Sequence, residues 1–281
     1  MRKPKVFVAG PVSWNRLVLV DRLPDPRPHT VFASGHRTAV GGTSAGKALN
    51  LASLGADVTL RTVVGDDEAG RAVLDVLGRA GVEVIAEQAE GATEQHLNLM
   101  DPHGGRLSIY LELPVLSRPR HHERALAALA AADAAVIDLA DHARPLLAAA
   151  RDAGVPVWCD LHDYDGVAEF HRDFLHAADH VFLNDDGFAD RDALLTFLKS
   201  LGKPAVATLG ADGAVLVADG AVERVAAAPV DEIVDTNGAG DAFFSGFLVA
   251  HLGGADAATA MAAGARQAAR CLGSTGLAPD L

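Results

Sequence analysis

Cysteine is nearly absent from this chain, whose 281 residues include only Cys159 and Cys271. Two cysteines cannot build a disulfide framework, and their spacing matches no common arrangement of metal ligands. We therefore expect both thiols to be buried as small apolar side chains, in a protein that works in a reducing compartment.

Long apolar runs are missing as well. No stretch of 18 apolar residues occurs, so the sequence predicts no transmembrane helix. The first apolar run, residues 5–9, is too short for the core of a signal peptide. These two absences predict a cytoplasmic protein with no membrane partner.

Positive charge is scarce. The chain has 24 Lys and Arg against 37 Asp and Glu, which gives a formal net charge of −13 at pH 7. Nucleic acids and acidic membranes are bound by clustered Lys and Arg, so this balance argues against both as partners. It does not exclude a small anionic substrate, because a site can be locally basic within an acidic protein.

The stretch of residues 234–252 combines glycines with a helical pattern. Apolar residues at helical spacing begin just after Gly238, Ala239 and Gly240, so these three residues are expected in the first turn of a helix. Backbone N–H groups there have no partner within the helix and favour an anion. Asp241 follows at once and could act as a general base on a hydroxyl beside that anion. The alternative is structural: residues 235–236 cap the helix and Asp241 only favours its positive end.

The string Asp-Thr-Asn-Gly-Ala-Gly-Asp-Ala-Phe at residues 235–243 resembles the signature of the ribokinase-like (PfkB) family of sugar and nucleoside kinases. The resemblance spans essentially the whole chain. It implies that Asp241 is the catalytic base, that the amides of Gly238, Ala239 and Gly240 form an anion hole, and that the cofactors are ATP and Mg²⁺. Some members of the family also bind a monovalent cation such as K⁺, near the place that residues 273–276 occupy here.

From residue 121 onward, apolar strand-like runs alternate with helical patterns. This alternation predicts an α/β fold with a parallel sheet and helices on both faces. Together with the resemblance, it indicates a single ribokinase-like three-layer domain over residues 1–281. Ligands in such sheets bind beyond the carboxyl ends of the strands. The candidates there are Asp138, Asp141, Asp160, His162, Asn184, Asp185, Gly210, Asp212 and Gly213.

Two insertions break this alternation, at about residues 15–39 and 94–113. Each reads as two short strands joined by a turn, with Pro-rich residues 24–28 in the first and Gly104-Gly105 in the second. The resemblance implies that together they form a small β-sheet lid, which closes over the substrate and often mediates a homodimer. Closure would keep water away from the transferred phosphoryl group.

The block at residues 41–52 can be read in two ways. Gly41, Gly46 and Lys47 nearly form a P-loop, but Ala48 stands where a magnesium-binding Ser or Thr is required. The block resembles instead the N-terminal glycine signature of the family, which implies substrate contacts from Gly41, Gly42, Lys47 and Asn50. Extra residues in the block leave open whether Gly41-Gly42 or Gly46-Lys47 is the contacting pair.

The remaining assignments also come from the resemblance. Asn15 stands where the family has an aspartate that binds sugar hydroxyls; its amide can still donate and accept hydrogen bonds. A nucleotide-binding turn is expected at Thr208, Gly210 and Gly213. Asn184 is expected near the phosphates and magnesium, with Asp185 holding the metal through water.

The sequence therefore predicts an ATP-dependent kinase of the ribokinase or fructokinase type, which transfers the γ-phosphoryl group to a primary hydroxyl of a sugar. A nucleoside kinase of the adenosine type is the alternative, favoured by Asn237 and by Asn15. A sugar-phosphate kinase would need a basic cluster, for which Lys47 and Arg37 are candidates. A further alternative is that the protein is not an enzyme but a sensor of a sugar or nucleotide. The intact Asp241 and glycine turn argue against this alternative.

Overall fold

The structure is a computed structural model that describes residues 2–102 and 104–279. Residues 1, 103, 280 and 281, which the single-domain prediction includes, lie outside the described residues. Within the described chain, no helix combines the length and the apolar character needed to cross a membrane.

A nine-stranded sheet forms the body, in the order β13-β12-β11-β10-β9-β8-β1-β4-β5. The strands from β11 to β5 in this order run parallel, and β12 and β13 add an antiparallel hairpin at one edge. The strands are β1 (Lys5–Ala9), β4 (Asp57–Val64), β5 (Glu83–Gln88), β8 (Ala134–Ile137), β9 (Val157–Asp160), β10 (His180–Asn184), β11 (Ala205–Thr208), β12 (Ala214–Ala218) and β13 (Ala221–Val225).

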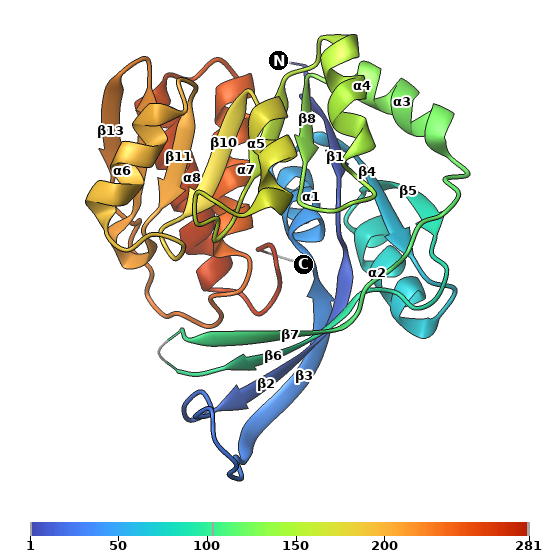
Figure 1. Cartoon of the computed structure of the whole chain (residues 1–281), viewed down its shortest axis with the longest axis vertical. Helices are drawn as coiled ribbons and strands as arrows, with labels where there is room; N and C mark the ends of the chain where they lie inside the picture. Colours follow the sequence, from blue (N-terminus) through green and yellow to red (C-terminus); the bar gives the residue numbers. More distant parts are fainter. Residues whose placement is uncertain (1, 103, 280–281) are drawn as a thin grey trace.

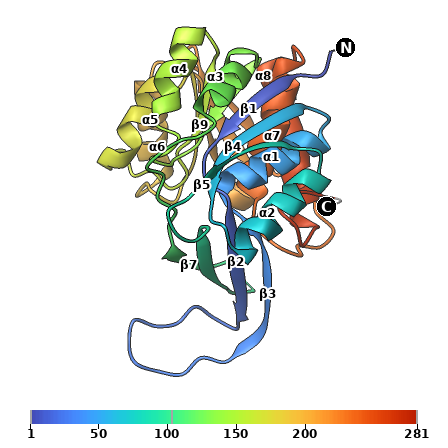
Figure 2. The same ribbon diagram turned by 90° about the vertical axis from the view of Figure 1, so that its right-hand side faces the viewer.

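Helices cover both faces of this sheet, as the alternating pattern predicts (Figure 2). One face packs against α1 (Thr43–Ser53), α2 (Glu68–Arg79), α7 (Ala239–Leu252) and α8 (Ala257–Leu272). The other packs against α3 (His122–Ala130), α4 (Pro145–Ala153), α5 (Arg172–Ala177) and α6 (Arg191–Ser200). Successive residues of a strand enter opposite cores: Val6 and Val8 face the first set of helices, while Phe7 and Ala9 face the second. The predicted three-layer α/β fold is confirmed.

A separate four-stranded sheet projects from the body (Figure 1). Its order is β3-β2-β6-β7, with β2 (Ser13–Val20), β3 (Ala33–Gly41), β6 (Gln95–Met100) and β7 (Arg106–Glu112). The two insertions thus pair with each other, through parallel β2 and β6. The first insertion differs from expectation in detail, because residues 30–32 are not strand and β3 continues to Gly41. We call this sheet the lid.

Asp67 joins the lid to the body. Asp67 is the N-cap residue of α2, and its carboxylate accepts a hydrogen bond from the backbone N–H of Gly70. The same carboxylate accepts hydrogen bonds from the backbone N–H and the hydroxyl of Thr93, just before β6. Burial opposes the charged form, but the hydrogen bonds from Thr93 and Gly70 outweigh it and hold the pKa of Asp67 below its ordinary value. The ionised carboxylate therefore stabilises the connection between α2 and the lid.

Replacing Asp67 with Ala should lower the free energy of unfolding by about 1–2 kcal/mol near pH 7, as measured by urea denaturation. Because the pKa is lower in the folded chain, this contribution is present above the unfolded pKa and is lost as the pH falls through the folded value. The difference between the two proteins should therefore shrink below about pH 4. Asp75→Ala, at an exposed ion pair with Arg79 on the same helix, is the control and should change stability by less than about 0.5 kcal/mol. Equal losses in the two variants would contradict the role of Asp67.

Candidate active site

A hollow of about 1690 Å³ lies between the carboxyl ends of the parallel strands and the lid. Parallel strands end at one edge of the sheet, so residues that follow β1, β8, β9, β10 and β11 converge there. The inner face of the lid forms the opposite wall, through alternate residues of β6 and β7. The hollow is therefore built from segments that are distant in sequence.

The N-terminus of α7 opens into this hollow without a side-chain cap. Gly238 is the N-cap residue at φ 80°, a conformation that favours glycine, and Ala239 begins the helix. The structural alternative for residues 235–236 is not observed. Asp235 instead forms an ion pair with Arg37 of β3, and Arg37 also donates to the carbonyl of Thr275 at 2.8 Å. The first N–H groups of α7 thus remain directed at a place where an anion would bind.

Asp241 lies in the first turn of α7 and lines the hollow. Its Oδ1 accepts hydrogen bonds from the hydroxyl of Thr43 at 2.7 Å and from Nζ of Lys47 at 2.9 Å. Its Oδ2 makes no hydrogen bond with any residue that the structure describes. One oxygen is therefore held by two donors, while the other lies against Gly46 without a donor among the described residues.

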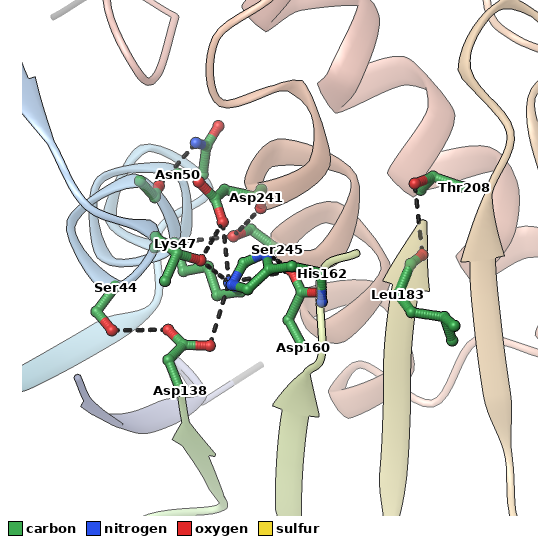
Figure 3. A network of polar contacts seen from close by, with 12 residues as sticks. Ser44, Lys47, Asn50, Asp138, Asp160, His162, Leu183, Thr208, Asp241 and Ser245 are labelled. Carbon is green, nitrogen blue, oxygen red and sulfur yellow. Dashed lines mark hydrogen bonds and ion pairs between the residues drawn. The ribbon is translucent and has the colours of Figure 1, made fainter. Parts of the chain in front are cut away.

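Lys47 does not line the hollow, although a substrate contact was expected for it. It is fully buried, and Nζ lies 3.2 Å from a carboxylate oxygen of Asp138 and 3.2 Å from one of Asp160, in addition to Asp241 (Figure 3). Burial lowers the pKa of Lys47, but the three carboxylates outweigh it and hold that pKa well above its ordinary value. Burial likewise raises the pKa of Asp138, whereas His162 and Lys47 overcome the effect of burial at Asp160 and lower its pKa to about 2.

The wall opposite α7 presents polar groups without partners. Asn15, Gly41 and Gly42 line the hollow, as expected for residues that contact the substrate. Asn98 lines it as well, and the side-chain oxygens of Asn15 and Asn98 have no hydrogen-bond partner within the described residues. Amide side chains at the edge of a hollow can both donate hydrogen bonds to hydroxyl groups and accept hydrogen bonds from them. This wall suits a polyhydroxylated molecule.

Asn50 is not at the hollow. Its amide donates to the carbonyls of Gly46 at 2.8 Å and Leu277 at 2.7 Å, and its oxygen accepts from Gln267 at 2.9 Å. With both amide hydrogens used, Asn50 joins α1 to α8 and to the C-terminal segment. The expected substrate contact is replaced by a structural one, because this side of α1 faces α8 and the C-terminal segment and not the hollow.

The residues expected at a nucleotide lie around the ends of β10 and β11. Asn184 and Thr208 line the hollow, and Thr208 donates to the carbonyl of Leu183 (Figure 3). Gly210 and Gly213 do not line it; they shape the turn after β11, where a Cβ at Gly213 would lie 2.7 Å from the backbone carbon of Ala226. Asp186, and not Asp185, lines the hollow, since Asp185 points toward Arg191 at 3.9 Å.

The two cations considered for a substrate phosphate are both occupied. Lys47 is buried among carboxylates, and Arg37 is paired with Asp235. Arg106 of β7 was missed by the sequence analysis: it lines the hollow and lies 3.4 Å from the side-chain oxygen of Asn237. Thr43 and Asn98 were missed as well. The alternation of β6 could have placed Asn98 on the same face as His96, but nothing in the local sequence says which face meets the hollow.

Comparisons with known proteins agree with this geometry. Residues 4–281 match the family described as "pfkB family carbohydrate kinase". An acarbose 7(IV)-phosphotransferase of Actinoplanes sp. is 32% identical over 270 residues, covering 92% of this chain and 89% of the relative. The solved structure of Mak1, a microbiome-derived acarbose kinase, is 30% identical and superposes with a TM-score of 0.83 over 98% of this chain and 94% of its own. An Arabidopsis thaliana ribokinase solved with ribose and ATP is 21% identical, with a TM-score of 0.81 over 99% of this chain and 96% of its own, and supports the fold.

Gly46 allows α1 to approach Asp241 closely. A Cβ at this position would lie 2.9 Å from Cγ of Asp241, which is too near for any real side chain. Gly46→Ala should therefore lower the free energy of unfolding by about 1–3 kcal/mol through overpacking, measured by urea denaturation. Gly78→Ala is the matched control, because Gly78 also lies within a helix but a Cβ there would meet nothing within 4 Å. That variant should gain up to about 1 kcal/mol from helix propensity. Stabilisation by both substitutions would contradict the close approach.

Proposed function

This chain belongs to the pfkB family of carbohydrate kinases, and we propose that it transfers the γ-phosphoryl group of ATP to a primary hydroxyl of a carbohydrate. One observation carries the proposal. Asp241, whose Oδ2 accepts no hydrogen bond within the described residues, lies in the first turn at the uncapped N-terminus of α7, in a hollow that also reaches Asn184 and Thr208. A proton acceptor, an anion site and a nucleotide edge thus meet in one place.

In the proposed mechanism Asp241 accepts the proton of the attacking hydroxyl as its oxygen approaches the phosphorus in line. The amides of Gly238, Ala239 and Gly240 donate to the phosphoryl oxygens, whose charge they offset. Mg²⁺ bound to ATP would neutralise phosphate charge, and Asn184 and Asp186, which line this edge of the hollow, would supply oxygen ligands directly or through water. The lid then closes over the acceptor and excludes water.

The amides of Asn15 and Asn98 in the wall of the hollow support a carbohydrate acceptor, because they are suited to neutral hydroxyl groups. Two relatives that are at least 30% identical are named as kinases of acarbose, which makes acarbose a candidate acceptor alongside simple sugars.

A sugar phosphate is the second candidate. Arg106 is exposed on the lid and lines the hollow near the anion site, where it could pair with a phosphate already present on the acceptor. The unpaired asparagine oxygens carry no charge and favour the neutral carbohydrate over this alternative.

The outer face of the lid supports a homodimer. Arg106, Ser108 and Tyr110 of β7 face the hollow, so Leu107, Ile109 and Leu111 point the other way, with 42%, 42% and 53% of their surface exposed. The register places Leu97 and Leu99 of β6 beside Ile109 and Leu107. An exposed apolar sheet face of this kind is typical of an interface, and we infer that a second copy of the chain covers it.

Two buried free cysteines fit a protein that acts in the reducing cytoplasm.

A panel of acceptors tests the activity. Pentoses, hexoses, their phosphates, nucleosides and acarbose are each offered with magnesium and ATP, and ADP release is measured. Turnover of a neutral carbohydrate is expected. On that acceptor, Asp241→Asn should lower kcat by about a hundredfold or more, because an amide cannot accept the proton.

Asp75→Asn, on the far surface of α2, is the control and should keep the kcat of the wild type. Turnover of only nucleosides or only sugar phosphates would replace the proposed acceptor by one of the alternatives, and no turnover with any acceptor would favour a sensor. Near-normal turnover by Asp241→Asn would rule out Asp241 as the base.

The dimer is tested by Ile109→Glu, which places a charge on the outer lid face. Sedimentation velocity should show a dimer for the wild type and a monomer for this variant at the same concentration, because burying an unpaired carboxylate is costly. Val167→Glu is the control, since Val167 is 67% exposed on the body of the molecule, and it should remain dimeric. A monomeric wild type would contradict the proposal.

A further inference from the structure

Lys47 has a central place but no contact with the hollow. Its side chain is fully buried, and its ammonium lies between the end of β8, the end of β9 and the first turn of α7 (Figure 3). The ring of Phe244, one turn further along α7, has its centre 5.1 Å from Nζ. Lys47 therefore cannot touch an acceptor or ATP, and any effect it has on the reaction passes through the groups that it contacts.

One face of α1 is directed at Asp241. Thr43, Gly46 and Lys47 are spaced by three and four residues, which places them on the same side of the helix. Thr43 and Lys47 both donate to Oδ1 of Asp241, and Gly46 leaves room for the carboxylate between them. Lys47 also donates to the Thr43 hydroxyl, so the two donors support each other. This face of α1 fixes the carboxylate by one oxygen only.

The cluster has one cation for three carboxylates. Lys47 stays charged because Asp138, Asp160 and Asp241 hold its pKa well above the ordinary value despite burial, so it cannot carry protons during the reaction. The other titratable groups around Asp241 are His162, which faces Asp160, and Cys271 of α8, whose pKa burial raises to about 12. Lys47 is thus the positive charge in direct contact with Asp241 among the described residues.

We propose that Lys47 is a positioning residue, which holds Oδ1 of Asp241 and leaves Oδ2 to accept the proton of the acceptor hydroxyl. Asp138 and Asp160 hold the ammonium in turn, from the ends of β8 and β9. The proposal rests on the proposed function, in which Asp241 is the base. The competing view is that Lys47 only balances charge in the folded protein.

Lys47→Met is the first test, with the acceptor that the panel identifies. The variant should lower kcat by about tenfold to a hundredfold, while KM for ATP changes by less than about twofold, because no contact with ATP is lost. The loss should therefore fall on kcat and not on KM. An unchanged kcat would overturn the proposal.

The double variant Lys47→Met with Asp138→Asn separates positioning from charge balance. It removes one carboxylate together with the cation, and the amide oxygen introduced by Asp138→Asn can still accept the hydrogen bond that Ser44 donates to Asp138 at 2.7 Å. Folding, measured by the melting temperature, should recover relative to the single variant, so the test survives if Lys47→Met alone does not fold. The kcat should stay low, because Oδ1 of Asp241 still lacks its donor. Full recovery of kcat would show that Lys47 only balances charge.

Lys203→Met is the matched control. Lys203 is a partly buried lysine, which donates to the backbone carbonyls of Leu175, His176 and Ala178 and to no carboxylate among the described residues. This variant should lose stability with little change in kcat. A similar loss of kcat in the control would overturn the proposal, since it would then reflect loss of any buried lysine.

A readout without turnover separates this proposal from the proposed function. In protein labelled with ¹³C at the aspartate carboxyl groups, the signal of Asp241 is assigned through Asp241→Asn. In Lys47→Met its chemical shift at a fixed pH should differ from that of the wild type, because Oδ1 has lost a donor. An unchanged chemical shift would overturn the role of Lys47 even in an active enzyme. A changed chemical shift in a protein that turns over no acceptor would instead count against the proposed function.

Discussion

The site depends on the close approach of α1 to the first turn of α7. This approach requires Gly46, because any side chain there would occupy the space of the Asp241 carboxylate. It brings Thr43 and Lys47 onto one oxygen of that carboxylate, and Lys47 extends the contact to Asp138 and Asp160 at the sheet edge. Two helices and two strands are thereby held around a single buried ammonium, which would be costly to bury without its three partners.

The two carboxylates nearest the N-terminus of α7, Asp235 and Asp241, each pair with a different cation. The N-terminus of α7 favours an anion, and the neighbouring carboxylate most able to occupy it, Asp235, is bound by Arg37 instead. The amides are therefore left for a ligand. Asp241 lines the same hollow, and its Oδ1 pairs with the buried ammonium of Lys47. The Asp241 carboxylate and a helix N-terminus that favours an anion can therefore lie close together without pairing with each other.

The lid contributes at both of its faces. Its inner face carries Asn98 and Arg106 toward the hollow, and Arg37 ties β3 to residues 235 and 275 of the body. Its outer face is apolar and exposed in a single chain. Successive residues of one strand point to opposite faces, so the same strands supply both the polar wall of the hollow and the exposed apolar face.

The sequence by itself determined the family, the α/β class and the glycine turn before Asp241, because these depend on local periodicity and on a contiguous motif. It also located the lid insertions, since strand–turn–strand patterns do not fit a helix-covered parallel sheet. It could not predict the contacts of Lys47 and Asn50, because helix α1 carries polar residues on two sides. Only packing decides that one side faces α7 and the other faces α8. Nor could it find Asn98, Arg106 or the cluster of Lys47 with Asp138 and Asp160. Those residues lie far apart along the chain, and the order of the strands, which only the tertiary structure decided, is what brings them together.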